Sequence, residues 1–194
     1  MSIPTNEYTE TFLAPLRGNL AILVLHDVEA KFAVGRLILN CARLRPADTL
    51  LLDVDGFYCT NMDRLVEDGR SVGEAQVLLL SEKDFDMNAL LALLTSKRRL
   101  LIIDGLNSLH SLSENRHASH QLAIILKILS YNARMNRSWA IATAYRPELG
   151  GKPGTNQRSL MALGNFVVDT YYRDGSLRLK AGFNGVWPND ELEV

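Results

Sequence analysis

The sequence predicts an α/β fold with a mostly parallel central sheet, flanked by helices and closed by a C-terminal antiparallel hairpin. Three observations predict it. Four short apolar runs are continuous rather than alternating, which is typical of strands that are buried on both faces. Segments with helical periodicity lie between these runs, as in βαβ units. Near the C-terminus an Asp-Gly pair separates two further apolar runs, which favours a hairpin.

The predicted strands follow from the position of the apolar runs. The four strongest are Asn19–Leu25, Thr49–Val54, Leu100–Asp104 and Ser138–Thr143, and a weaker fifth is Gln76–Leu80. The closing hairpin is predicted over Asn165–Tyr172 and Ser176–Ala181. Helices are predicted over Ala30–Leu44, Asp86–Leu94 and His120–Met135, because apolar residues recur there every three or four positions.

The length of 194 residues fits one core-bearing domain. We expect an N-terminal arm over residues 1–18, a core domain over 19–182 and a C-terminal tail over 183–194. The 21 basic and 22 acidic side chains give a net charge of −1, which excludes a nucleic-acid binder that relies on bulk positive charge.

Membrane insertion and secretion are not expected. The longest apolar runs fall far short of the roughly 18–20 residues that a membrane span needs. The first ten residues lack the basic and apolar regions of a secretory signal. With only two cysteines, the sequence predicts a cytoplasmic protein with reduced thiols, or a nuclear one if the source is eukaryotic.

Several segments, taken in order, carry a family resemblance. Leu51–Leu65 (LLDVDGFYCTNMDRL) is a strand that ends in an acidic residue, glycine and an aromatic residue, and Leu100–Leu109 (LLIIDGLNSL) looks like a Walker B strand. Ser111–Ser119 and Gly150–Arg158 are polar loops, and YYRDGSLRLKAG is the predicted hairpin. From about Pro15 to Gly182 the chain therefore resembles the ATPase core of the RecA/RadA recombinase family. The resemblance implies a RecA-like three-layer fold.

The departure from this family lies at the phosphate loop. A Walker A motif, G-x-x-x-x-G-K-[ST], follows the first strand in such proteins. Lys31 keeps the lysine place, but Leu25 and Ala30 replace the glycines and Phe32 replaces the hydroxyl residue that would bind Mg²⁺. Non-glycine residues in left-handed geometry cost about 1–2 kcal/mol each. Every one of these changes works against binding of a nucleotide.

Acidic residues add to this departure. Asp27 and Glu29 bring two carboxylates to a loop that would hold polyphosphate, and a like-charge contact at about 4 Å costs roughly 4 kcal/mol at an effective dielectric of 20. We therefore expect a pseudo-ATPase rather than an enzyme, without ATP, Mg²⁺ or another cofactor or metal. Asp104 stands at the metal-linked aspartate of the family and Asp55 at its water-activating glutamate. Because an unpaired buried charge is costly, the sequence predicts that Lys31 pairs with Asp104 or Asp55 in this remnant nucleotide site.

The resemblance also implies candidate interaction residues. The two polar loops fall where the family places its DNA-binding loops, so phosphate contacts are expected from Arg116, His117, Arg146, Lys152 and Arg158. The N-terminal arm carries Phe12 and Ala14, which are candidates for docking into a neighbouring subunit.

These features predict a non-catalytic RecA/RadA-like recombinase paralogue. It would bind a recombinase or another paralogue in a homo- or hetero-oligomer. It would also contact single-stranded DNA as an accessory factor in homologous recombination and DNA repair, away from membranes. Two alternatives remain open at this point: a divergent RecA-like or KaiC-like ATPase, and a purely structural or signalling subunit of a protein complex.

Overall fold

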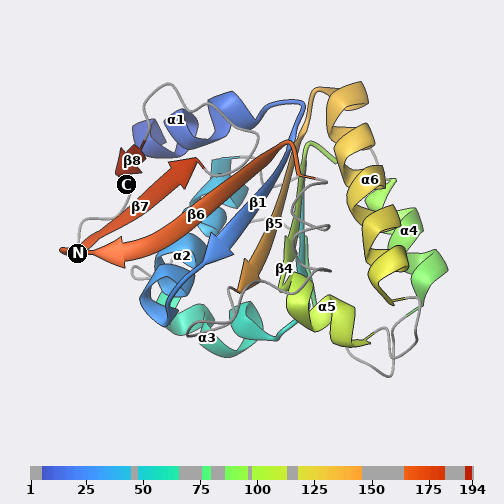
Figure 1. Ribbon diagram of the computed structural model, residues 1–194, viewed down its shortest axis with the longest axis horizontal. Helices are drawn as coiled ribbons and strands as arrows, with labels where there is room; N and C mark the ends of the chain where they lie inside the picture. Colours follow the sequence, from blue (N-terminus) through green and yellow to red (C-terminus); the bar gives the residue numbers. More distant parts are fainter. Residues whose placement is uncertain are drawn as a thin grey trace.

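A computed structural model of the chain describes residues 6–44, 48–65, 76–79, 86–95, 98–112, 118–145, 164–181 and 191–193. Over these ranges a single sheet runs through the middle of the protein, with helices on both of its faces (Figure 1). The predicted α/β architecture with a mostly parallel sheet and a C-terminal antiparallel hairpin is confirmed.

The described sheet has eight strands in the order β3-β2-β4-β5-β1-β6-β7-β8. Its strands are β1 (Leu20–Leu25), β2 (Thr49–Asp53), β3 (Gln76–Leu79), β4 (Leu100–Asp104), β5 (Trp139–Tyr145), β6 (Phe166–Arg173), β7 (Ser176–Ala181) and β8 (Glu191–Glu193). The first six strands of this order, from β3 through β2, β4, β5 and β1 to β6, pair in parallel. Strand β7 pairs antiparallel with both β6 and β8. The turn of the β6–β7 hairpin contains Asp174 and Gly175, both with positive φ, as an Asp-Gly turn requires.

Over the described ranges, six helices connect or flank these strands. They are α1 (Asn6–Leu16), α2 (Val28–Leu44), α3 (Phe57–Leu65), α4 (Met87–Leu94), α5 (Leu106–Leu112) and α6 (Ala118–Asn136). The three helices predicted from periodicity correspond to α2, α4 and α6. The start of α4 is fixed by Asp86, whose carboxylate accepts a hydrogen bond from the amide of Asn88 at 2.9 Å.

Two hydrophobic cores lie on opposite faces of the sheet. The first core contains apolar side chains of α1, α2 and α3, and the second core contains those of α4, α5 and α6. Every residue of the central strands β1, β2 and β4 is buried, which explains why their sequences are continuous apolar runs rather than alternating ones. The result is three layers, with the sheet between two layers of helices (Figure 1).

Within the expected N-terminal arm over residues 1–18, the described residues of α1 pack onto the core instead of standing apart from it. Phe12, Leu13 and Leu16 are fully buried in the first core. The indole Nε1 of Trp139 also donates a hydrogen bond of 2.7 Å to the carbonyl oxygen of Leu13. Because Phe12 packs inside its own chain, its side chain is not available to a neighbouring subunit while α1 holds this position, whereas Ala14 is exposed.

Two further segments differ from the sequence interpretation. Residues 191–193, expected to belong to a tail, form β8 and pair with Arg178–Lys180 of β7. The polar segment Ser111–Ser119 is predicted to be a loop, but its first residue, Ser111, lies in α5 and its last, Ser119, lies in α6. Among the described residues, no helix has the length and apolar character that crossing a bilayer requires.

The packing of α1 generates a stability prediction. Phe12→Ala removes a fully buried ring from the first core and should lower the free energy of unfolding by about 3–5 kcal/mol. Ala14→Ser, on the exposed side of the same helix, is the matched control and should change it by less than about 0.5 kcal/mol. Urea unfolding followed by circular dichroism measures both. Equal effects of the two substitutions would mean that α1 is not packed on the core.

Candidate functional site

The candidate site lies at the carboxyl edge of the parallel strands. The connections that leave neighbouring strands β2 and β4 go to opposite faces of the sheet, because α3 packs in one core and α5 in the other. In open α/β sheets, such a divergence places ligand sites outside the carboxyl ends of the strands. Asp53 and Asp104, the last residues of β2 and β4, are paired in register at this position.

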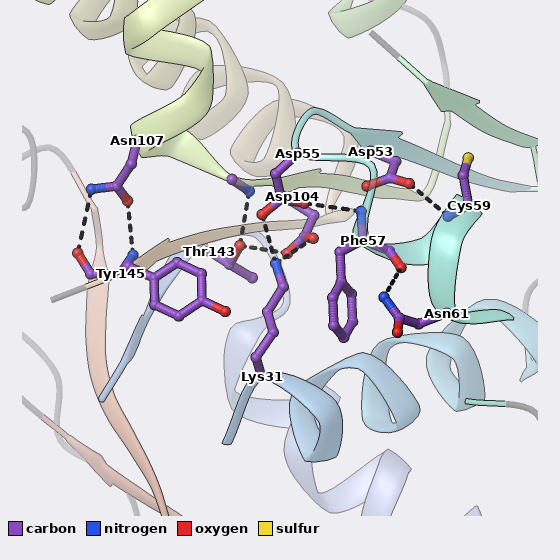
Figure 2. A network of polar contacts seen from close by, with 11 residues as sticks. Lys31, Asp53, Asp55, Phe57, Cys59, Asn61, Asp104, Asn107, Thr143 and Tyr145 are labelled. Atoms are coloured by element: carbon purple, nitrogen blue, oxygen red, sulfur yellow. Dashed lines mark hydrogen bonds and ion pairs between the residues drawn. The ribbon is translucent and has the colours of Figure 1, made fainter. Parts of the chain in front are cut away.

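Lys31, in the first turn of α2, is the centre of the site. Its Nζ donates a hydrogen bond of 2.5 Å to Asp104 Oδ2 and a second one of 3.2 Å to Asp55 Oδ2. Figure 2 shows the lysine extending from α2 towards these two carboxylates. The predicted pairing of Lys31 is therefore confirmed, and it involves both of the predicted partners.

Aromatic rings enclose this ion pair. The Nζ atom of Lys31 lies 4.7 Å from the ring centroid of Phe57 and 5.6 Å from that of Tyr145, so both rings make cation–π contacts with it. In Figure 2 the lysine lies between the two rings. As a consequence, the side chain of Lys31 is only 2% exposed and that of Asp104 only 1%, whereas that of Asp55 is 22% exposed.

A second set of contacts fixes the carboxylate of Asp104. The hydroxyl of Thr143, on β5, donates a hydrogen bond of 2.5 Å to Asp104 Oδ1 and accepts one of 2.9 Å from the amide of Gly105. Gly105 has a φ of +99°, and a Cβ atom at this position would lie 3.3 Å from Asp55 Cγ. Glycine is therefore the residue that lets Asp55 approach the end of β4 closely.

A third carboxylate, that of Asp53, lies beside the other two. One oxygen of each of Asp53, Asp55 and Asp104 lies within 4.8 Å of the others. Asp53 Oδ2 accepts a hydrogen bond of 2.9 Å from the amide of Cys59, while its buried Oδ1 has no hydrogen-bond partner among the described residues. Burial, together with Asp104 and the other nearby carboxylates, raises the pKa of Tyr58 well above its usual value.

The electrostatics of the site are dominated by burial. The pKa of Asp104 is raised to about 6, because removal from water and the charge of Asp55 raise it by more than Lys31 and Thr143 lower it. The lysine thus offsets part of the cost of holding a carboxylate at the buried end of β4.

The N-terminus of α2 is closed by a carboxylate of the chain itself. Asp27 Oδ1 accepts a hydrogen bond of 2.5 Å from the amide of Ala30, and Asp27 Oδ2 accepts one of 3.3 Å from the amide of Tyr172. This is the position at which a helix N-terminus would bind phosphate. Asp27 therefore acts as an internal anion for the helix.

The chain that joins β1 to α2 is also too short to surround a phosphate. Only His26 and Asp27 separate Leu25 from Val28, and no described residue from Leu25 to Lys31 has a positive φ. His26 Nε2 lies 2.8 Å from Asp169 Oδ1 on β6. Phe32 turns into the first core, with its ring centroid 5.1 Å from that of Phe57.

These observations test whether the site fits a magnesium nucleotide. Between Leu25 and Lys31 the backbone lacks the left-handed turns that aim several amides at one phosphate. The lysine is already bound to two carboxylates, and an aromatic side chain stands where a Mg²⁺-binding hydroxyl would be needed. The residues present therefore do not fit a bound nucleotide with Mg²⁺.

The other predicted site residues are not part of this cluster. Arg116, His117, Arg146, Lys152 and Arg158, predicted to contact DNA, lie outside the described residues. Phe12 and Ala14, predicted to contact a partner, lie on α1, with Phe12 in the core and Ala14 on the surface.

Sequence reasoning missed several residues of the site. Thr143 is the one fully buried hydroxyl residue of β5, whose sequence is WAIATAY, and such a residue in a buried strand is a signal that it has a buried partner. Asn107 was also missed. Its side-chain amide donates to the carbonyl of Tyr145 at 3.3 Å and accepts from the amide of Tyr145 at 2.8 Å, which links α5 to the end of β5.

Comparison with known proteins adds no relative at this point. No model of a known protein family matches the chain, and no curated protein sequence matches it significantly.

The buried ion pair generates a prediction about stability and pH. Lys31→Met leaves the carboxylate of Asp104 without its main cation, which should lower the free energy of unfolding by about 3–5 kcal/mol at pH 7. The pKa of Asp104 lies above the unfolded value of 3.8 and rises further without Lys31. The folded state therefore binds the additional proton as the pH falls, so the loss should be smaller at pH 5 than at pH 7.

Lys127→Met is the matched control, because Lys127 is an exposed lysine on a helix and its replacement should have little effect at either pH. Denaturant unfolding at pH 5 and pH 7 gives the four values needed. A loss for Lys31→Met that does not depend on pH would argue against a buried, ionised Asp104.

Proposed function

We propose that the protein is a non-catalytic, RecA/RadA-like pseudo-ATPase that works through its surfaces, as an accessory subunit in homologous recombination and DNA repair. The observation that carries the proposal is the bonding of Lys31 to Asp104 and Asp55 behind two aromatic rings. A lysine in this state has no free charge with which to bind a triphosphate.

The arrangement of the same residues supports a RecA-like origin. Lys31 stands at the lysine place of a phosphate loop and Asp104 at the place of the metal-linked aspartate, and the two side chains are in direct contact at the carboxyl edge of a parallel sheet. If an ancestral protein lost its nucleotide but kept this lysine and this aspartate, the two buried charges would need new partners. An ion pair between them meets that need.

Nucleotide binding is the first test of this proposal. A ligand that binds the folded state with a dissociation constant 100-fold below its concentration stabilises it by about 2.7 kcal/mol. We expect no change in the unfolding midpoint with millimolar ATP and Mg²⁺. Lys31→Met, which lacks the phosphate-binding charge, is the reference for non-specific effects. Stabilisation of the natural chain but not of this variant would indicate a divergent ATPase instead.

Contact with single-stranded DNA is the second test, because it separates an accessory recombination factor from a purely structural subunit. We expect a weak electrophoretic shift at low salt that disappears as the salt concentration rises. Arg146→Ala, Lys152→Ala and Arg158→Ala together should abolish it.

The matched control for the DNA experiment removes three positive charges elsewhere, with Arg17→Ala, Lys127→Ala and Arg173→Ala. It should leave most of the binding intact, since these exposed residues lie outside the predicted loops. No shift of the natural chain at low salt, or the same loss in both triple variants, would remove DNA from the proposal and favour the structural subunit.

A further inference from the structure

An apolar stripe on the outer side of α6 is not explained by the fold. Its members are Ile124, Ile128, Tyr131 and Met135, which follow one another at intervals of four, three and four residues. Ile124 is 40% exposed, Tyr131 63% and Met135 62%. Ile128 is half-buried and packs against the same core as the buried side of the helix, which is formed by Leu122, Ile125, Leu126, Leu129 and Ala133. The intervals of the stripe are those of helices that pack along a seam.

On one side the stripe is bordered by α4, which lies beside α6 on the same face of the sheet (Figure 1). Asn132 donates a hydrogen bond of 2.6 Å to the carbonyl of Leu94, so this side of α6 faces α4. Ile128 and Met135 lie one turn before and after Asn132 on the helix surface. The sequence of α4, MNALLALL, contains no charged residue, and its Ala92 is exposed.

The opposite border of the stripe is basic. His120, Lys127 and Arg134 are exposed and recur at intervals of seven residues, which places them in one row along α6 beside Ile124 and Tyr131. Neither α4 nor α6 contains an acidic residue. The acid nearest in sequence to α4 is Asp86, whose side chain caps the start of that helix.

We infer that this surface, formed by the apolar stripe and its basic row, binds an amphipathic helix of another protein that carries an acidic row along one side. An apolar seam supplies the buried area and a charged border selects the partner and its orientation. A second copy of this chain complements the surface poorly, because it would bring the same basic row and no acid from α4 or α6. The surface lies on the other side of the sheet from α2 and Lys31, so the inference does not depend on the proposed function.

The test uses two synthetic helical peptides of 21 residues that share a leucine seam with intervals of three and four. One carries glutamate along one border of the seam, and the other carries lysine at the same positions. Fluorescence anisotropy measures their binding to the full chain. We expect the glutamate peptide to bind on the order of tenfold more tightly than the lysine peptide at low salt, with the difference shrinking as salt is added.

Two substitutions connect that binding to this surface. Tyr131→Glu should abolish binding of the glutamate peptide, whereas Leu79→Glu, at an apolar residue that is 54% exposed on β3, should not. Charge reversal with Lys127→Glu and Arg134→Glu should make the chain prefer the lysine peptide. The unfolding midpoint of Tyr131→Glu should equal that of the natural chain, since its side chain is mostly exposed.

Each other outcome overturns the inference. Failure to bind either peptide, or equal binding of both, removes the acidic helix as the occupant. A lowered unfolding midpoint for Tyr131→Glu would mean that another part of this chain covers the stripe. A dimer in sedimentation equilibrium that Tyr131→Glu dissociates would identify the occupant as a second copy.

Discussion

The hydrogen-bonded ion pair between Lys31 and Asp104 is the contact on which the rest of the site depends. It joins the first turn of α2 to the end of β4, two elements that lie far apart in the sequence. Neither charge would be tolerated alone at this depth, because an isolated buried ion costs several kcal/mol. Asp55 accepts a second hydrogen bond from the Lys31 ammonium, and Thr143 donates one to the Asp104 carboxylate. The carboxyl edge of the sheet is therefore held together by charges that satisfy one another.

This constraint explains the surrounding residues. Phe57 and Tyr145 cover the ammonium with their rings, which is compatible with a cation that needs no water. Asp27 satisfies an amide at the start of α2, so the helix needs no external anion. The ammonium of Lys31 and the amide of Ala30, which could attract phosphate at this edge, are thus bound within the chain. The apolar stripe of α6 and its basic border, in contrast, are accessible at the surface, which suits binding to a partner rather than chemistry.

Most of the fold was predictable because its elements have simple apolar patterns. Strands buried on both faces are continuous apolar runs, and helices buried on one side have apolar residues every three or four positions. The predicted strands, the hairpin and the helices α2, α4 and α6 all correspond to described elements. The short helices α3 and α5 gave no usable periodicity, since each presents only a turn or two to the core. The packing of α1 was missed because it depends on Trp139, more than a hundred residues away. Lys31, Asp55 and Asp104 were predicted as a set from the resemblance to a nucleotide-binding core and from the cost of an unpaired buried charge, whereas Thr143 and Phe57 join the site through tertiary packing.

The ammonium of Lys31 is held by carboxylates of the same chain and is shielded by two aromatic rings. The most direct measurement is the NMR signal of the Lys31 side-chain NH₃⁺ group, assigned by comparison with Lys31→Met and followed during addition of ATP with Mg²⁺. We expect a signal that exchanges slowly with water, is protected relative to that of the exposed Lys127, and does not move when nucleotide is added. A signal that exchanges as fast as that of Lys127, or one that shifts with nucleotide in a saturable way, would contradict it.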